Sequence, residues 1–233
     1  MHLPLRFEPL PQAGDFKAPG DGMTVWLSAD RVRLGAIRMR LAGAQRHAAF
    51  TGFDVLTSHS NYVIGSAPRD WRTNVPNYAR VKFTAVYPGI DLIYRGDGEQ
   101  LEYDFVLAPH ANAQLPRLVF EGASSVTVDD QGGLVVHGGN NGKAQSLRFK
   151  KPVAYQDGHE VDVRYELLAR GGIGFRLGRY DTADPVTIDP TLVFATYLGG
   201  NYASANGIAV DSSGNIYLAG SACCWFPLKN ALD

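Results

Sequence analysis

Short runs of alternating apolar and polar residues recur along the chain and predict β-strands. Across residues 101–107, every second residue is leucine, tyrosine or phenylalanine, and the residues between them include Glu102 and Asp104. Such alternation gives a strand one apolar face and one polar face. Similar segments lie at residues 23–27, 36–41, 81–86, 90–94, 118–120, 161–168 and 173–177. No window holds an apolar period of 3.6 residues, so the pattern predicts an all-β protein with an antiparallel, sandwich-like domain.

Two hairpins are predicted with particular clarity. Residues 90–94 and 101–107 flank a loop that contains Gly96 and Gly98. Near the C-terminus, apolar runs surround Asp211-Ser212-Ser213-Gly214, a sequence typical of a hairpin turn with a bulge. Residues 126–138 align without gaps to residues 208–220, and recurrent turn chemistry explains this at least as well as duplication.

A change in composition predicts a domain boundary near residue 190. Pro185 and Pro190 bracket a short apolar run, and the sequence that follows is rich in glycine. We therefore assign residues 1–190 to the sandwich-like domain and residues 191–233 to the start of a second, repeat-like unit.

Bulk composition limits the classes of function. The 233 residues include 26 glycines and 13 prolines, and 22 basic against 23 acidic side chains leave a net charge of -1. Such a chain offers no overall field that attracts nucleic acid or an anionic membrane. No stretch is apolar over the length that a membrane helix needs, and the first forty residues lack the apolar centre of a signal peptide. We expect no nucleic-acid partner, no membrane insertion and no signal peptide in this segment.

Motifs for metal binding and catalysis are missing from the sequence. Cys223 and Cys224 are adjacent, so they lack the separation found in zinc motifs, and we interpret them as two free thiols. The six histidines form neither HxH nor HExxH. No G-x-S-x-G motif and no glycine-rich phosphate loop occurs. We therefore expect no cofactor, no metal and no enzymatic activity.

Acidic residues around the first hairpin allow one catalytic alternative. Glu99, Glu102 and Asp104 include two carboxylates that share a strand face, and glycosidases need such a pair. We interpret them instead as solvent-facing acids on an antiparallel arm. The tripeptide Arg95-Gly96-Asp97, an RGD sequence at the predicted tip, is explained by ordinary turn composition.

Arginine and aromatic side chains are the candidates for a ligand surface. Arg31 and Arg33, and then Arg38 and Arg40, alternate with apolar residues, which predicts a charged, solvated sheet face of the kind expected for any edge hairpin. Contact of this face with a polysaccharide or phosphate is the alternative. Large aromatic rings stack on sugars when exposed, although in β-domains they are more often part of the core. The candidate ligand contacts are Trp26, Trp71, Tyr94, Arg38 and Arg40.

Two sets of short motifs carry a family resemblance. Thr196–Gly200, Gly207–Asp211, Gly214–Gly220 and Phe226-Pro227 resemble the first unit of the SBBP repeats, which are named for a seven-bladed β-propeller. Upstream landmarks resemble the domain of unknown function that commonly precedes these repeats in bacterial proteins. They are Asn61–Gly65, Trp71–Pro76, Val86–Leu92, Leu101–Phe105, Lys151–Gln156 and Ile188–Pro190.

The resemblance implies an antiparallel β-sandwich-like domain followed by an incomplete β-propeller blade at residues 191–233. It also implies export or display on the cell surface. The expected partners are the remaining propeller blades of the full-length chain, and a polysaccharide or a cell-surface protein. We expect a non-enzymatic structural or binding module outside the cell. A carbohydrate-binding β-sandwich and a glycoside hydrolase or lyase are the alternatives.

Overall fold

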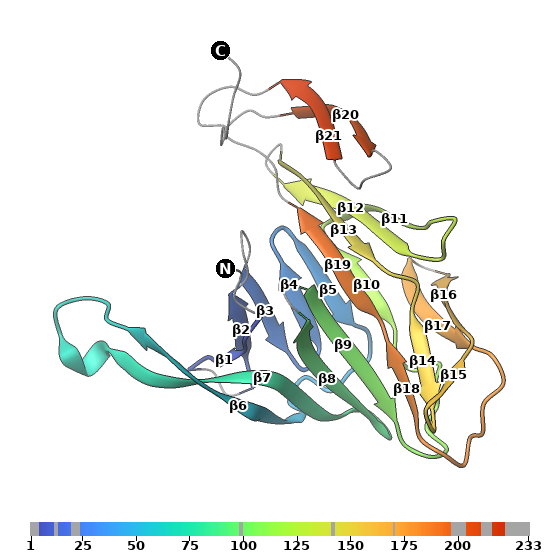
Figure 1. Ribbon diagram of the computed structural model, residues 1–233, viewed down its shortest axis with the longest axis horizontal. Helices are drawn as coiled ribbons and strands as arrows, with labels where there is room; N and C mark the ends of the chain where they lie inside the picture. The colour runs from blue at the N-terminus through green and yellow to red at the C-terminus, as the bar shows by residue number, and fades with distance from the viewer. Residues whose placement is uncertain are drawn as a thin grey trace.

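Two large antiparallel sheets dominate the protein (Figure 1). The computed structural model describes residues 5–11, 14–19, 24–97, 100–140, 143–169, 171–196, 204–210 and 216–221. Within these residues the only helical element is the short 3-10 turn η1 (Pro68–Asp70), and every strand pairing is antiparallel. The prediction of an all-β, sandwich-like protein is confirmed. No helix in the described ranges has the length and apolar character that crossing a membrane requires.

The first sheet is built mostly from the N-terminal part of the chain. Its strand order is β1-β2-β3-β4-β5-β10-β17-β16. The bounds of these strands are β1 Glu8–Pro9, β2 Phe16–Pro19, β3 Thr24–Ser28, β4 Arg31–Leu34, β5 Ile37–Leu41, β10 Leu118–Glu121, β16 Val163–Leu168 and β17 Gly172–Leu177.

The second sheet contains the central and C-terminal strands. From one edge its order is β11-β12-β13-β19-β9-β18-β14-β15, and β9 also pairs with β8, which continues through β7 to β6. The bounds are β6 Ala49–Tyr62, β7 Arg72–Tyr87, β8 Ile90–Asp97, β9 Gln100–Leu107, β11 Ala123–Val128, β12 Leu134–Asn140, β13 Lys143–Phe149, β14 Val153–Gln156, β15 His159–Val161, β18 Val186–Asp189 and β19 Thr191–Thr196.

Both predicted hairpins are confirmed. Strand β8 pairs with β9 from Ile90 opposite Leu107 to Asp97 opposite Gln100. Strands β20 (Ser204–Val210) and β21 (Ile216–Ser221) form a separate two-stranded sheet. The turn between them, and Cys223 and Cys224, lie outside the described residues.

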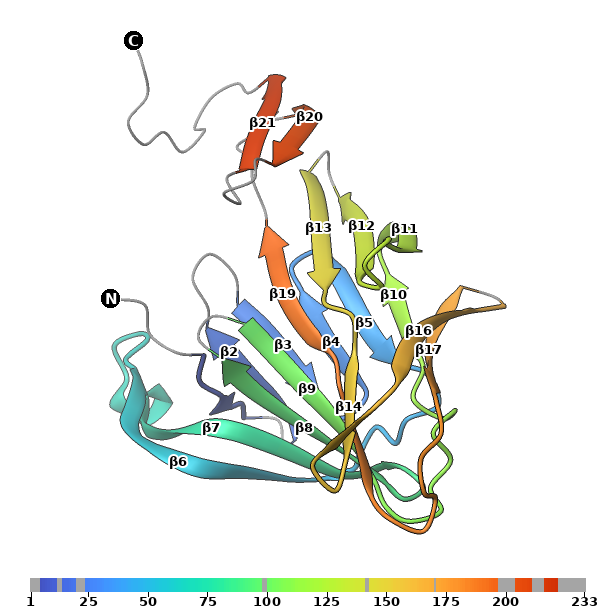
Figure 2. The ribbon, with the colours of Figure 1, turned by 45° about the vertical axis from the view of Figure 1, so that its right-hand side comes forward.

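The core lies between the two sheets and is held by aromatic rings. Figures 1 and 2 show the blue strands of the first sheet behind β8, β9 and β19 of the second. Phe16 of β2 meets Phe83 of β7 edge-on, with ring centroids 6.2 Å apart. On β9, Phe105 meets Phe175 of β17 at 5.7 Å. These contacts cross the sandwich, so each sheet turns its apolar face inward.

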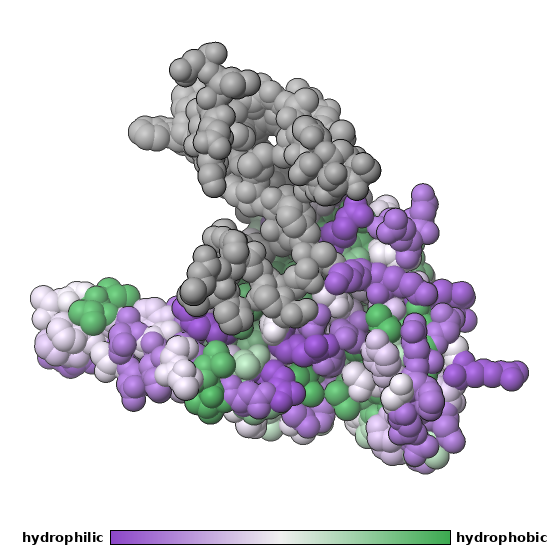
Figure 3. Space-filling model, in the orientation of Figure 1, coloured by the Kyte–Doolittle hydropathy of each residue, from purple (hydrophilic) through white to green (hydrophobic). Residues whose placement is uncertain are grey.

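Strands β6 and β7 continue beyond the body of the sandwich as a long hairpin arm (Figure 1). The arm is tied to the first sheet through Glu8 of β1. The buried carboxylate of Glu8 accepts a hydrogen bond from the hydroxyl of Tyr62, the last residue of β6, and lies 3.6 Å from Lys17 Nζ. Towards the tip, Val63 and Ile64 are exposed, and Figure 3 shows apolar surface there.

Strand β19 extends the second sheet past residue 190, where the sequence analysis placed the domain boundary. It pairs with β13 and, through Thr191 and Leu192, with β9. The amide of Lys150 also donates a hydrogen bond to the Thr191 carbonyl at 2.9 Å. Residues 191–196 therefore belong to the sheet of the sandwich. The glycine-rich pattern that suggested the boundary begins only after this strand.

We expect Phe105→Ala to lower the free energy of unfolding by about 3–5 kcal/mol, because it leaves a cavity between the sheets where the Phe105 ring is fully buried. Urea denaturation followed by circular dichroism measures the change. Leu167→Ala is the control, since this exposed side chain on β16 should lose less than about 0.5 kcal/mol. Equal losses in the two variants would contradict the two-sheet core.

Candidate functional site

Four arginines lie on the outer face of the first sheet. On β4, Val32 and Leu34 are buried, which leaves Arg31 and Arg33 pointing outward. On β5 the same alternation exposes Arg38 and leaves Arg40 half-buried on the outer face. The sequence prediction of a charged sheet face is therefore confirmed for this hairpin.

The strand register places these arginines directly opposite one another. Arg31 pairs with Arg40 across the sheet, and Arg33 pairs with Arg38. Like charges at opposed positions destabilise a sheet. Within the described residues no carboxylate lies within ion-pair distance of Arg33 or Arg38. The Arg33 guanidinium instead lies 5.0 Å from the centre of the Trp26 ring on β3, a cation–π contact.

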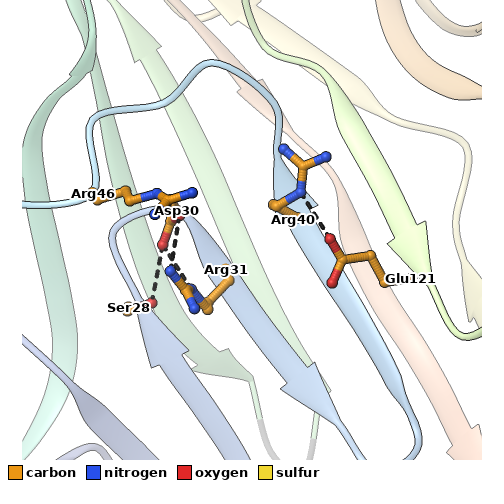
Figure 4. A network of polar contacts seen from close by, with 6 residues as sticks. All are labelled: Ser28, Asp30, Arg31, Arg40, Arg46 and Glu121. Carbon is orange, nitrogen blue, oxygen red and sulfur yellow. Dashed lines mark hydrogen bonds and ion pairs between the residues drawn. The ribbon is translucent and has the colours of Figure 1, made fainter.

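The Arg31/Arg40 pair is held in place by carboxylates (Figure 4). Arg31 donates to both carboxylate oxygens of Asp30, at 2.9 and 3.2 Å, and Arg46 approaches Asp30 to 3.6 Å from the loop after β5. The hydrogen bond to Asp30 and its negative charge raise the pKa of Arg31. Arg40 donates to Glu121 of β10 at 2.9 Å. Asp30, which is 4% exposed, thus fixes two cations at one end of the face.

A hollow of about 780 Å³ lies over these strands, and we call it the arginine groove. Its lining contains Trp26 and five arginines, which are Arg31, Arg33, Arg38, Arg40 and Arg46. The carboxylates in the lining are Asp15, Asp30 and Glu121. The groove therefore has a surplus of two positive charges. Guanidinium groups bind carboxylate, sulfate or phosphate through paired hydrogen bonds, so the arrangement suits an anion.

The structure brings together three of the five candidate contacts. Trp26, Arg38 and Arg40 all line the arginine groove. Trp71 lies on the hairpin arm, where its indole nitrogen donates to the Gly65 carbonyl at 3.1 Å, and it lines none of the described hollows.

Tyr94 was wrongly included among the candidate contacts. Its side chain is fully buried, because Ile90, Leu92 and Tyr94 form the inward face of β8. Its ring packs against Phe83 and Tyr103, with centroids 6.0 and 6.3 Å away. Tyr94 therefore belongs to the core and cannot reach a ligand on the outside.

Four further charged residues of the groove were not predicted, which are Asp15, Asp30, Arg46 and Glu121. Asp30 stands directly before Arg31 in the turn after β3, where a polar residue is ordinary. Arg46 lies in a loop, and Glu121 lies on a strand far along the chain. The pairing of β5 with β10 places Glu121 opposite Arg38, and from there its carboxylate reaches Arg40, so no local pattern could identify it.

The acids of the first hairpin are held by Arg95 rather than facing solvent. The Arg95 guanidinium contacts Glu102 at 2.6 Å, Asp104 at 3.1 Å and Asp189 of β18 at 2.7 Å. The expectation of solvent-facing acids is wrong, because this shared cation draws three carboxylates together and Glu102 is only 8% exposed. Glu99 lies outside the described residues.

Burial raises the pKa of Asp104 to about 6, although the neighbouring Arg95 acts in the opposite direction. Glu102 and Asp189 also raise it, since three carboxylates share one guanidinium. None of the described hollows is lined by these acids. The RGD tripeptide is likewise part of this packing: Arg95 is engaged, and a side chain at Gly96 would meet the Cβ of Leu5 at 2.6 Å.

Fold and site together define a two-sheet β-domain with a cationic groove, followed by a separate β-hairpin. Residues 11–191 match the family model described as a domain of unknown function, DUF7948, and residues 193–222 match that of the SBBP β-propeller repeat. The chain belongs to the DUF7948 family, and the resemblance found in its sequence is confirmed. Neither the curated proteins nor the solved structures contain a match.

We expect Asp104→Asn to flatten the pH dependence of stability. Asp104 has a pKa of about 6 when folded and an ordinary value of 3.8. Between these values the folded state holds a proton on Asp104 that the unfolded state has released. The contribution of this proton to the free energy of unfolding is therefore lost as pH rises from about 4 to about 6. Urea unfolding at about pH 4 and pH 7 measures this change.

Asp130→Asn is the matched control, because it removes a carboxylate from the exposed turn after β11. It should retain the wild-type fall in stability between the two pH values. An Asp104→Asn variant with that same fall would show that Asp104 does not titrate in this range.

Proposed function

We propose that the chain is a non-enzymatic binding module whose arginine groove takes up an anionic ligand. The observation that supports this proposal is the pair of opposed arginines, Arg33 and Arg38. No carboxylate of the described residues lies within ion-pair distance of either, and Glu121, which stands opposite Arg38 on β10, accepts its hydrogen bond from Arg40. The repulsion between the two opposed arginines is a cost to the folded protein, and a bound anion removes it. A costly arrangement of this kind is typical of a binding site.

The rest of the groove is organised for the same task. Asp30 and Glu121 hold the guanidinium groups of Arg31 and Arg40 in fixed positions, which reduces the side-chain entropy lost on binding. The Trp26 ring lies against the guanidinium of Arg33 and holds it in place. The groove is therefore prepared for a ligand that carries negative charge.

We propose that the module acts outside the cell, next to the remaining blades of a β-propeller. The SBBP match supports the second part of this proposal. Among the described residues strands β20 and β21 form a two-stranded sheet, and such a hairpin is marginally stable without further partners. Additional blades would supply these partners. A cell-surface polysaccharide or protein is the proposed ligand class outside the chain.

The other two interpretations receive less support. A carbohydrate-binding surface built on a row of aromatic rings is not favoured, because Tyr94 is buried and Trp71 lies away from Trp26. For a glycoside hydrolase or lyase, the carboxylates around Arg95 would have to face a cleft, and none of the described hollows includes them.

We expect Arg38→Gln to weaken binding to dextran sulfate by about tenfold or more, because one charge-assisted contact contributes about 1.5–3 kcal/mol. The same variant should unfold with an equal or slightly higher free energy, by about 0.2–1 kcal/mol, since it removes a like-charge pair. Titration calorimetry and urea denaturation measure the two effects.

Arg164→Gln is the matched control. Arg164 also stands opposite an arginine, Arg176, but on β16 and β17 and away from the groove. It removes the same charge and should leave dextran sulfate binding unchanged. Equal losses of affinity in both variants would show that binding depends on the net charge of the protein and not on the groove. No binding of dextran sulfate by the wild type would refute the proposal.

A further inference from the structure

We propose that the ligand of the arginine groove is a linear acidic polysaccharide that lies along β4 and β5 and contacts both arginine pairs. This inference rests on the proposed function and specifies its ligand. Two observations support it, which are the length of the hollow surface and the positions of the positive charges along it.

The hollow surface continues beyond the groove at both ends. A neighbouring hollow of about 610 Å³ shares Asp30, Arg31 and Arg46 with the groove. Another of about 430 Å³ shares Arg33, Arg38 and Glu121, and reaches Gly35 in the turn after β4. Because Arg31 begins β4 and Gly35 follows its end, the groove and the hollow of about 430 Å³ form a trough along the strand. The hollow of about 610 Å³ leads from the Arg31 end towards Phe50 of β6 and Phe83 of β7.

Positive charge is repeated along this trough. The Arg31/Arg40 pair and the Arg33/Arg38 pair are two residues apart on each strand, a separation of about 7 Å. A small anion can reach one pair at a time. A chain with repeated negative groups can contact both pairs at once, and its second contact is then intramolecular.

The carboxylates of the groove favour a sugar chain over a nucleic acid. Asp15, Asp30 and Glu121 line the same surface as the arginines. They would repel closely spaced phosphates, whereas sugar hydroxyls can donate hydrogen bonds to them. Single-stranded nucleic acids are bound on several exposed aromatic rings. In the groove Trp26 is already covered by Arg33, and Phe16 is buried in the core.

Titration calorimetry with the intact chain tests the inference through ligand length. The probes are galacturonic acid and its dimer, tetramer and octamer, a matched series of sulfated dextran oligomers, neutral dextran oligomers and oligo-dT. For at least one acidic series we expect affinity to rise by about a hundredfold from monomer to octamer. Neutral dextran should not bind, and oligo-dT should bind more weakly than the acidic octamer.

Variants of the two arginine pairs identify the cause of this length dependence. Arg38→Gln and Arg40→Gln each leave one pair intact, so each should bring the affinity of the octamer close to that of the dimer while the monomer still binds. Arg164→Gln should keep the full length dependence.

The outcomes separate the two proposals. A rise with length for uronates, for sulfated sugars or for both supports the inference and identifies the acidic group. Acidic monomers that bind as tightly as octamers, or oligo-dT that binds more tightly than both series, would overturn it while anion binding stands. Binding to none of the anions, dextran sulfate included, would remove the proposed function as well.

Discussion

The face-to-face packing of two sheets through aromatic rings is the constraint on which the rest of the structure depends. Phe16 with Phe83, and Phe105 with Phe175, bring side chains of both sheets into one dry layer. Since strand residues alternate between faces, this layer forces the intervening charged residues to the outside. The arginines of β4 and β5 and the acids of β9 owe their positions to the burial of their neighbours.

The charged side chains on the outer faces of the two sheets are paired to different extents. On the second sheet, Arg95 gathers three carboxylates from β9 and β18 into a compact, largely buried cluster. On the first sheet the cations are in excess, and Arg33 and Arg38 face each other with no carboxylate of the described residues within ion-pair distance. The first arrangement pairs its charges internally, whereas the second leaves a surplus of two positive charges in the groove, which the proposed anionic ligand would neutralise. This difference is why the groove, and not the acidic cluster, is the candidate site.

Local pattern predicted the strands and the outward direction of Arg31, Arg33, Arg38 and Arg40, because alternation depends on neighbouring residues alone. The same alternation separates Trp26, which lies between the buried Val25 and Leu27, from Tyr94, which is in phase with the buried Ile90 and Leu92. Local pattern misjudged Glu102, whose burial depends on Arg95 across the hairpin and on Asp189 far along the chain. Contacts of that kind are set by topology.

Strand β19 determines how the junction between the two units resists a pulling force. It is hydrogen-bonded to β13 on one side and to β9 on the other, and the segment matched to the propeller repeat begins within it at residue 193. A tension directed along the axis of β19 would load its hydrogen bonds in shear, those to β13 from Leu192 to Thr196 and those to β9 at Thr191 and Leu192. The repeat is attached to the sandwich by an anchored strand.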